Sequence, residues 1–225
     1  MGEAIGETLG FAFGVAISPV PIIAVILMLF SARAVGNGVA FLVGWFLGVS
    51  LAAGVFYLLA DTQQETSDAG PSTVVSVVKL ALGALLLLAA VRQWRARPGP
   101  GEEPTMPRWM QGIDGFTPVK SFGLAAVLGG VNPKNLALAG AAGATIAGLG
   151  LPTGRGIASI LLFALVGSVS VGIPVVYRLV AGGRAQGTLD GWKTWLQANN
   201  ATVMAVLLLL FGVLLIGRAI AELSA

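Results

Sequence analysis

The sequence predicts an all-α integral membrane protein with six transmembrane helices, arranged as two inverted three-helix repeats with broken first helices. Composition, the spacing of long uncharged segments and the distribution of arginine lead to this fold class. Of the 225 residues, 56% are hydrophobic and only 10% are charged, whereas a soluble domain usually contains about 25% charged residues. Lipid is therefore the expected surrounding of most of the chain.

The apolar segments give the expected spans. A hydrocarbon core about 30 Å thick is crossed by roughly 20 apolar residues in a helix. The segment from Ser121 to Pro152 is interrupted only by Lys134, and as one straight helix it would be about 48 Å long, so it must tilt, break or re-enter. Six spans are expected, at residues 5–31, 38–60, 73–92, 120–147, 156–179 and 198–221.

Basic residues in the loops predict the orientation, because Lys and Arg are retained on the cytoplasmic side of a membrane. The loop between the second and third spans contains Asp61, Glu65 and Asp68 but no basic residue. Both termini are therefore expected outside the cytoplasmic membrane. The loops after the first, third and fifth spans are expected inside, because they contain Arg33, Arg92, Arg95, Arg97, Arg108, Lys120, Arg178, Arg184 and Lys193.

The chain divides into two halves. Residues 1–93 are expected to form the first repeat, 94–119 a basic cytoplasmic linker with an interfacial segment, and 120–225 the second repeat. Each half contains an odd number of spans, so the repeat must be inverted in the membrane. Short motifs match between the halves: Ser18-Pro19-Val20-Pro21 with Asn132-Pro133-Lys134-Asn135, and the segment around Gly83 with the segment around Gly212.

Both proline motifs are interpreted as helix starts inside the membrane. Ser18 and Asn132 are good N-cap residues, and proline is favoured as the first residue of a helix. A helix N-terminus has free N–H donors and about half a positive charge, which suits phosphate, sulfate or carboxylate. The alternative is that these prolines only kink the helices for packing.

Lys134 is the most costly side chain in these segments, since an ammonium group at the centre of a bilayer costs roughly 2.5 to 3.5 kcal/mol. Its partner is a backbone carbonyl, a loop acid such as Asp114, or the substrate, which we favour. The alternative is that Lys134 extends towards an interface. Lys79 is interpreted as extending in this way, and Gly44 and Gly48 are expected to form a close helix-packing face.

The sequence resembles the lysine-exporter (LysE) superfamily, and within it the GAP family of glycopeptidolipid- and sulfolipid-addressing proteins. The Ser-Pro-x-Pro break, the basic central loop, Trp109, Asp114 and the segment Gly130 to Leu136 carry the resemblance. It implies a six-helix exporter that moves envelope glycolipids or their precursors. The implied substrate-binding and pathway residues are Ser18, Pro19, Pro21, Asn132, Pro133, Lys134 and Asn135.

We expect a transporter with no catalytic residue, metal or cofactor. The chain has no cysteine or histidine, which excludes thiolate nucleophiles, imidazole bases and common zinc ligands, and its net charge of +3 does not favour nucleic acid. The expected partners are membrane lipids, a glycolipid or small anionic substrate, and envelope-lipid export machinery; oligomerisation is left open. The alternatives are an exporter of small solutes such as amino acids or cations, and a non-transporting accessory subunit of an export machine.

Overall fold

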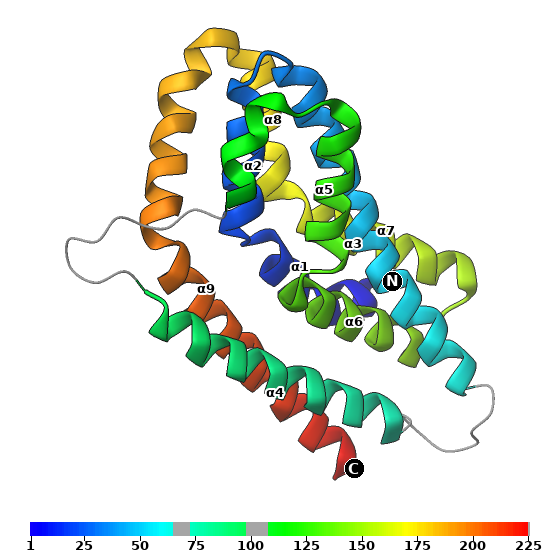
Figure 1. The fold of residues 1–225 in the computed structure, drawn as a ribbon. Helices are drawn as coiled ribbons and strands as arrows, with labels where there is room; N and C mark the ends of the chain where they lie inside the picture. The colour runs from blue at the N-terminus through cyan, green and yellow to red at the C-terminus, as the bar shows by residue number, and fades with distance from the viewer. Residues whose placement is uncertain (65–72, 98–107, 225) are drawn as a thin grey trace.

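The computed structural model describes residues 1–64, 73–97 and 108–224, and every element in these ranges is helical (Figure 1). Glu65 and Asp68 lie outside the described residues, as do the side chains of Trp109 and Asp114. The elements are α1 (Gly2–Ala16), α2 (Pro19–Phe30), α3 (Ala34–Gln64), α4 (Thr73–Arg95), η1 (Arg108–Gly115), α5 (Pro118–Gly130), α6 (Pro133–Gly148), α7 (Thr153–Gly167), α8 (Val169–Ala181), η2 (Gly182–Arg184) and α9 (Ala185–Leu223).

The helices follow the expected segments, but fewer of them qualify individually as membrane spans. In the described part of the chain, Ala34–Asp61 and Val169–Leu223 are long and apolar enough to cross a membrane. The pair α1 and α2, bent by 55°, would make a third span. The number is below the six expected partly because the segments 5–31, 120–147 and 156–179 are each divided into two shorter helices. Helix α4, which covers the expected span 73–92, is undivided but is not among the helices that qualify.

Two of the breaks are encoded locally. Proline removes a backbone donor and disfavours a helical conformation of the residue before it. Accordingly, α2 begins at Pro19 and α6 begins at Pro133, each directly after its N-cap residue. These are the predicted breaks in the first span of each half.

The third break, between α7 and α8, lies at the pair Gly167-Ser168 and has a local and a distant contact. Ser168 Oγ donates to the Ala164 carbonyl within the same turn. Trp45 in α3 donates its indole N–H to the carbonyl oxygen of Gly167, the last residue of α7, at 3.2 Å. A side chain that bonds a helix carbonyl interrupts the regular ladder and bends the helix. Trp45 is fully buried, so this second contact reaches the break from within the core.

Helix α3 forms the centre of the molecule, where it packs against α2, α5, α6, α7 and α8. A Cβ atom added at Gly44 or Gly48 would overlap the backbone of Phe122 or Ala126 in α5. These glycines therefore allow the two backbones to approach closely, which confirms the predicted packing face.

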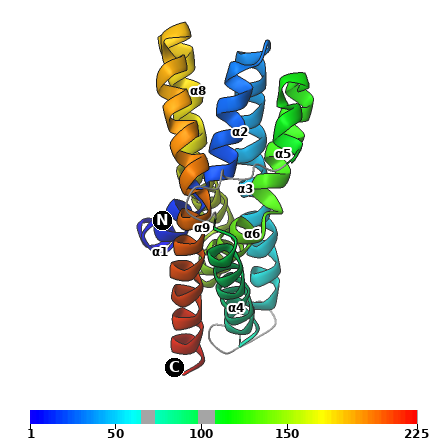
Figure 2. The same cartoon turned by 60° about the vertical axis from the view of Figure 1, so that its left-hand side comes forward.

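Helices α4 and α9 form a second packed pair (Figure 2). Gly83 of α4 and Gly212 of α9 face each other at their crossing, since a Cβ at either would lie about 3 Å from the other's carbonyl oxygen. Helix α9 has 39 residues and is thus about 58 Å long. It begins well before the expected span at 198, and its first part contains Asp190, Lys193 and Asn199.

The turns between helices and the C-terminus lie at two opposite ends of the molecule, and the N-terminus lies between these ends (Figure 1). The α2–α3 turn, the start of α5 and the α8–α9 corner lie at the upper end in Figure 1, and the start of α4 and the end of α9 at the lower end. At the upper end, Asn37 Nδ2 donates to Ser31 Oγ at 3.1 Å and to the Phe116 carbonyl at 3.0 Å.

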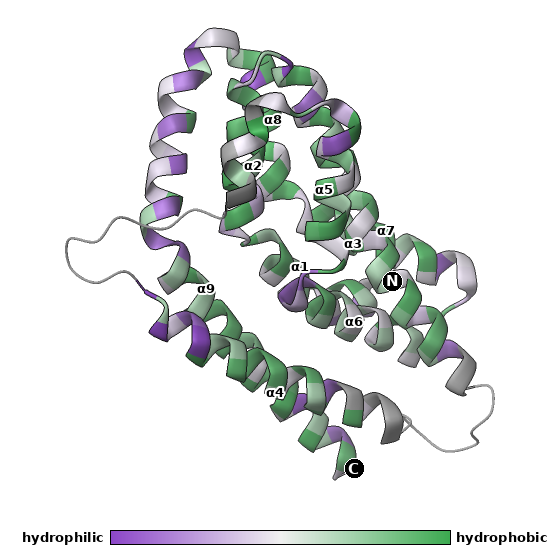
Figure 3. Cartoon of the chain, in the orientation of Figure 1, coloured by the Kyte–Doolittle hydropathy of each residue, from purple (hydrophilic) through white to green (hydrophobic). Residues whose placement is uncertain are grey.

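Apolar residues also cover the outside of the helices (Figure 3). Exposed examples are Leu51 in α3, Leu88 in α4 and Leu210 in α9, whose exposed fractions are 67%, 71% and 52%. A large apolar exterior of this kind marks a surface that contacts membrane or another protein.

Candidate functional site

The two broken segments meet at Lys134. This residue is the second of α6, and its side chain is directed to the break between α1 and α2. Its Nζ donates to the carbonyls of Gly14 and Ile17 at 2.5 and 2.9 Å, and to Ser18 Oγ at 2.7 Å. The residue is only 2% exposed. Three acceptors match the three N–H donors of an ammonium group.

The end of α1 explains why a cation is held there. The last carbonyls of a helix have no partner within the helix and carry a partial negative charge. Lys134 bonds two of the carbonyls at this end. The others are bonded by Ile17 N, which donates to Phe13 O; by Ser18 Oγ, which donates to Val15 O; and by Ser18 N and Ser170 Oγ, which both donate to Ala16 O.

The two predicted N-caps behave differently. Asn132 Oδ1 accepts from the backbone N–H of Lys134 at 3.1 Å, as predicted. Ser18 makes no side-chain cap, so its predicted capping role is wrong. Its hydroxyl instead donates to the Val15 carbonyl and accepts from Lys134 Nζ, which directs it back to α1 and leaves it unable to reach the first turn of α2.

The first turns of α2 and α6 offer few amide donors. Pro19, Pro21 and Pro133 have no N–H, and the amide of Lys134 is already bonded to Asn132. Among the first three residues of each helix, only Val20 and Asn135 retain an amide for which the structure describes no partner. An anion would therefore receive fewer backbone donors than an ordinary helix N-terminus supplies.

The remaining predicted residues lie around this junction without converging on one point. Pro19 and Pro21 are buried, whereas Pro133 is exposed. Asn135 is fully buried; its Nδ2 donates to the Leu128 carbonyl at 3.0 Å, and its Oδ1 is without a described partner. The structure therefore brings together Ser18, Asn132 and Lys134 and places the others beside them.

The partner of Lys134 is a set of protein oxygens. The favoured interpretation, contact with the substrate, stays a prediction, and Lys134 does not extend to an interface. Backbone carbonyls were among the partners considered, but every residue has one, so the sequence cannot show which of them a helix break leaves free. The role of the Gly14 carbonyl was missed for the same reason, and that of the Ser170 hydroxyl because it bonds Ala16, 154 positions away.

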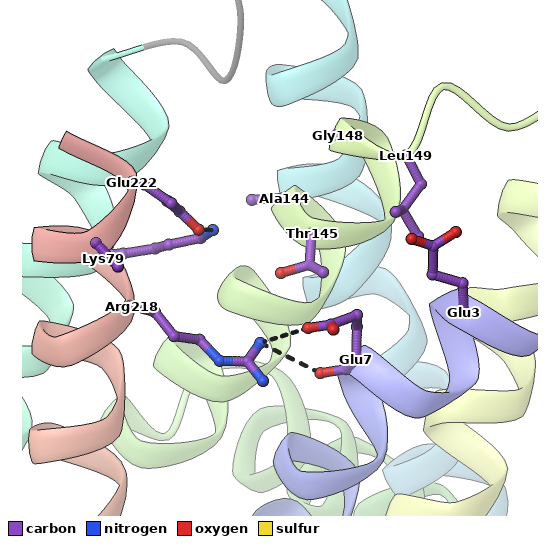
Figure 4. A pocket seen from close by; sticks show the side chains of 10 residues that line it. Glu3, Glu7, Lys79, Ala144, Thr145, Gly148, Leu149, Arg218 and Glu222 are labelled. Carbon is purple, nitrogen blue, oxygen red and sulfur yellow. Dashed lines mark hydrogen bonds and ion pairs between the residues drawn. The ribbon is translucent and has the colours of Figure 1, made fainter. Parts of the chain in front are cut away.

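A second polar region is a cavity of about 400 Å³ between α1, α4, α6 and α9 (Figure 4). Two ion pairs line it: Arg218 Nη1 lies 3.2 Å from Glu7 Oε2 across the cavity, and Lys79 Nζ lies 2.5 Å from Glu222 Oε1 on the α4–α9 wall. The lining residues are Glu3, Glu7, Lys79, Ala144, Thr145, Gly148, Leu149, Arg218, Ala221 and Glu222.

Lys79 is part of this cavity and does not extend to solvent, contrary to the prediction. It is 5% exposed, and Glu222 accepts from both Lys79 and Ser76. Sequence reasoning missed the pairing because the two residues lie 143 positions apart in the chain. The available signal was a charged residue near the end of each of two apolar segments.

A protein-family comparison agrees with the resemblance to the GAP family. The profile described as SfLAP, "Sap, sulfolipid-1-addressing protein", matches residues 8–221 and so covers almost the whole chain. No curated protein and no solved structure matches. The chain is a lipid-related membrane protein, and it belongs to the Sap, sulfolipid-1-addressing protein family.

Proposed function

We propose that the protein is an exporter or flippase that moves an anionic or polar-headed envelope lipid across the cytoplasmic membrane. The observation that carries this proposal is the junction of two broken helices at Lys134. Non-helical backbone at membrane depth is tolerated where it is buried in protein or lines a cavity, and transporters use such breaks around their pathway.

The junction suits movement because its contacts are polar and few. Lys134 Nζ holds the end of α1 and the start of α6 through three hydrogen bonds. An exchange of these acceptors for others would allow the two broken segments to change their relative angle. Alternating access requires two packed arrangements of the same helices, and such an exchange would supply them.

The proposal includes six spans in two inverted repeats, with both termini external. Residues at equivalent positions of two inverted halves meet where they lie near the pseudo-two-fold axis. Two matched pairs support this: the motif at Ser18 meets the motif at Lys134, and Gly83 meets Gly212. The start of α1 and the end of α9 line one cavity. This supports the placement of both termini on the same side of the membrane.

A lipid is favoured over a small solute for two reasons. The first is that the description of the family names a sulfolipid. The second is that the α4–α9 pair forms one wall of the cavity, and its exposed residues include Leu85, Leu88 and Val213. Acyl chains could therefore remain in the membrane while the headgroup enters. We place the family within the lysine-exporter superfamily, and the proposal assigns no catalytic step to the chain.

The test is reconstitution of the purified chain into phosphatidylcholine vesicles with trace fluorescent lipids. A reductant that does not cross the membrane bleaches only the outer leaflet, so transport appears as additional bleaching. We expect faster bleaching of fluorescent phosphatidylglycerol than in protein-free vesicles. Efflux of labelled lysine without lipid movement would favour the solute exporter, and the absence of both with folded protein would favour the accessory subunit.

A further inference from the structure

We propose that a pocket between the end of α4 and the middle of α9 binds an anionic phospholipid, which stays in the cytoplasmic leaflet as a resident lipid and is not the exported substrate. The pocket shares no lining residue with the polar cavity, which contacts the other end of α4. The inference takes from the proposed function only the cytoplasmic placement of this end, and it concerns binding alone.

The pocket has an apolar lining that opens to the outside of the helix pair. Its volume is about 200 Å³, below the roughly 300 to 1,000 Å³ of sites that enclose a whole small molecule, so it suits one part of a flexible acyl chain. Val91, Trp94 and Val206 are about half exposed. The lining includes Ala90, Val91, Trp94, Arg95, Ala205 and Val206.

Arg92 and Arg95 supply positive charge at one side of the pocket. Arg95 lines it, and Arg92 lies three residues earlier, so both project from the same side of α4. Both are exposed. Among the described residues, no ion pair involves either arginine and no carboxylate lines the pocket. The carbonyls at the end of a helix carry partial negative charge, so the arginines must be the groups that attract an anion.

Trp94 and Arg97 indicate the depth of the pocket in the membrane. The guanidinium carbon of Arg97 lies 3.2 Å from the centroid of the Trp94 ring, and its Nε donates to the Trp94 carbonyl at 3.0 Å. Tryptophan is enriched at membrane–water interfaces, and Figure 3 shows hydrophilic residues at this end of α4 and apolar residues along its middle. The arginines therefore lie at the level of lipid headgroups and the apolar lining lies deeper.

An anionic phospholipid fits both parts of the site. A guanidinium group matches the geometry of phosphate and can form two parallel hydrogen bonds with it, and basic residues at the cytoplasmic end of a membrane helix attract anionic lipids. An uncharged glycolipid would leave both arginines uncompensated. The choline group of phosphatidylcholine would bring a cation next to them. Inorganic phosphate would use the arginines but leave the apolar lining empty.

The experiment is lipid competition in nanodiscs that contain the full chain and equal amounts of three lipids with identical oleoyl chains: phosphatidylglycerol, phosphatidylcholine and monoglucosyl diacylglycerol. Native mass spectrometry of the released protein measures which lipid stays bound. Both faces of a nanodisc are open, so the result does not depend on the topology. We expect phosphatidylglycerol to be enriched about tenfold over each of the others. Equal retention of the three lipids, or a preference for the choline or the glucosyl lipid, would overturn the inference.

Variants of the lining locate the bound lipid. Arg92→Gln and Arg95→Gln should each lower the enrichment about fivefold, the size expected for one basic residue near an anionic lipid. Val206→Trp fills the pocket from a half-exposed position and should lower it as well. Arg184→Gln, at an exposed position outside the pocket, is the matched control and should keep the wild-type enrichment. Wild-type enrichment in both Arg92→Gln and Arg95→Gln would refute the site.

A further variant separates this lipid from an exported substrate. Ser18→Ala changes the Lys134 junction, and neither residue lines the pocket, so the variant should retain phosphatidylglycerol as the wild type does. Loss of enrichment in Ser18→Ala would assign the bound lipid to the transport pathway and contradict the inference. Because binding is measured without transport, a chain that exports no lipid should still give the expected enrichment, and the two proposals can fail separately.

Discussion

At the residue scale, Lys134 joins two breaks that lie 116 positions apart in the chain. Its ammonium group is costly in an apolar interior, and it is stabilised because the end of α1 needs donors as much as the lysine needs acceptors. The lysine thereby satisfies carbonyls that would otherwise be buried without a partner. This reciprocal need makes Lys134 a structural as well as a candidate functional residue.

Lys134→Met tests that role, because methionine has a similar length but no donor. The carbonyls of Gly14 and Ile17 would lose their described partner, and we expect a loss of about 3 kcal/mol. The apparent Tm in detergent should fall by about 6 to 12 °C. Lys120→Met, at an exposed position, is the control and should change little. Equal Tm values for both variants would show that these hydrogen bonds contribute no stability.

The sequence predicted part of this site. Asn132 was recognised because Asn before Pro is a local signal, and its cap involves the next two residues only. Ser18 carries the same local signal, but its hydroxyl is engaged by Lys134 and Val15. A contact between remote positions decides that outcome, and a single sequence contains no direct trace of it.

At the element scale, the close approach of α3 and α5 depends on small residues. Gly48→Ala would place a methyl group against the backbone of Ala126, and backbone cannot move aside without shifting the helix. We expect a loss of roughly 1 to 3 kcal/mol. Gly54→Ala is the matched control in the same helix, because a Cβ there has nothing within 4 Å. It should be neutral or stabilise by up to about 1 kcal/mol.

Denaturant unfolding in detergent, followed by circular dichroism, measures both glycine variants. If Gly48→Ala is as stable as Gly54→Ala, then α3 and α5 are not packed at this distance. The comparison uses one helix and one substitution, so differences in helix propensity cancel.

Element boundaries were predictable where the signal is local. Apolar segments and prolines gave the helices and the breaks at Pro19 and Pro133. The break after Gly167 was missed although it lies at a local Gly-Ser pair, Gly167-Ser168. Trp45, 122 positions away, also bonds the Gly167 carbonyl. The early start of α9 was also missed, because its first part is polar and contains Gly187 and Gly191, and it was interpreted as a loop.

At the scale of the whole molecule, we expect Ser224 and Gly183 to lie on opposite sides of the membrane. Ser224 ends α9 beside the polar cavity, and Gly183 lies in the α8–α9 corner with its neighbouring arginines. The chain has no cysteine, so single cysteines at these positions report their own exposure. We expect an impermeant maleimide to label Ser224→Cys in intact cells and Gly183→Cys only after lysis. The reverse pattern would invert the topology.

The most direct measurement of the central claim compares lipid transport by junction variants at matched levels of folded protein. Ser18→Ala removes one of the three acceptors of Lys134 but leaves the two carbonyls, so folding should persist. Lys134→Arg keeps the charge but replaces a compact ammonium by a larger planar group. If the junction is the moving element, both variants should transport fluorescent phosphatidylglycerol at least about tenfold more slowly, a change of 1.4 kcal/mol in the barrier. Lys120→Met should transport at the wild-type rate. Wild-type rates in Ser18→Ala and Lys134→Arg would contradict the account, because transport would then proceed without these contacts.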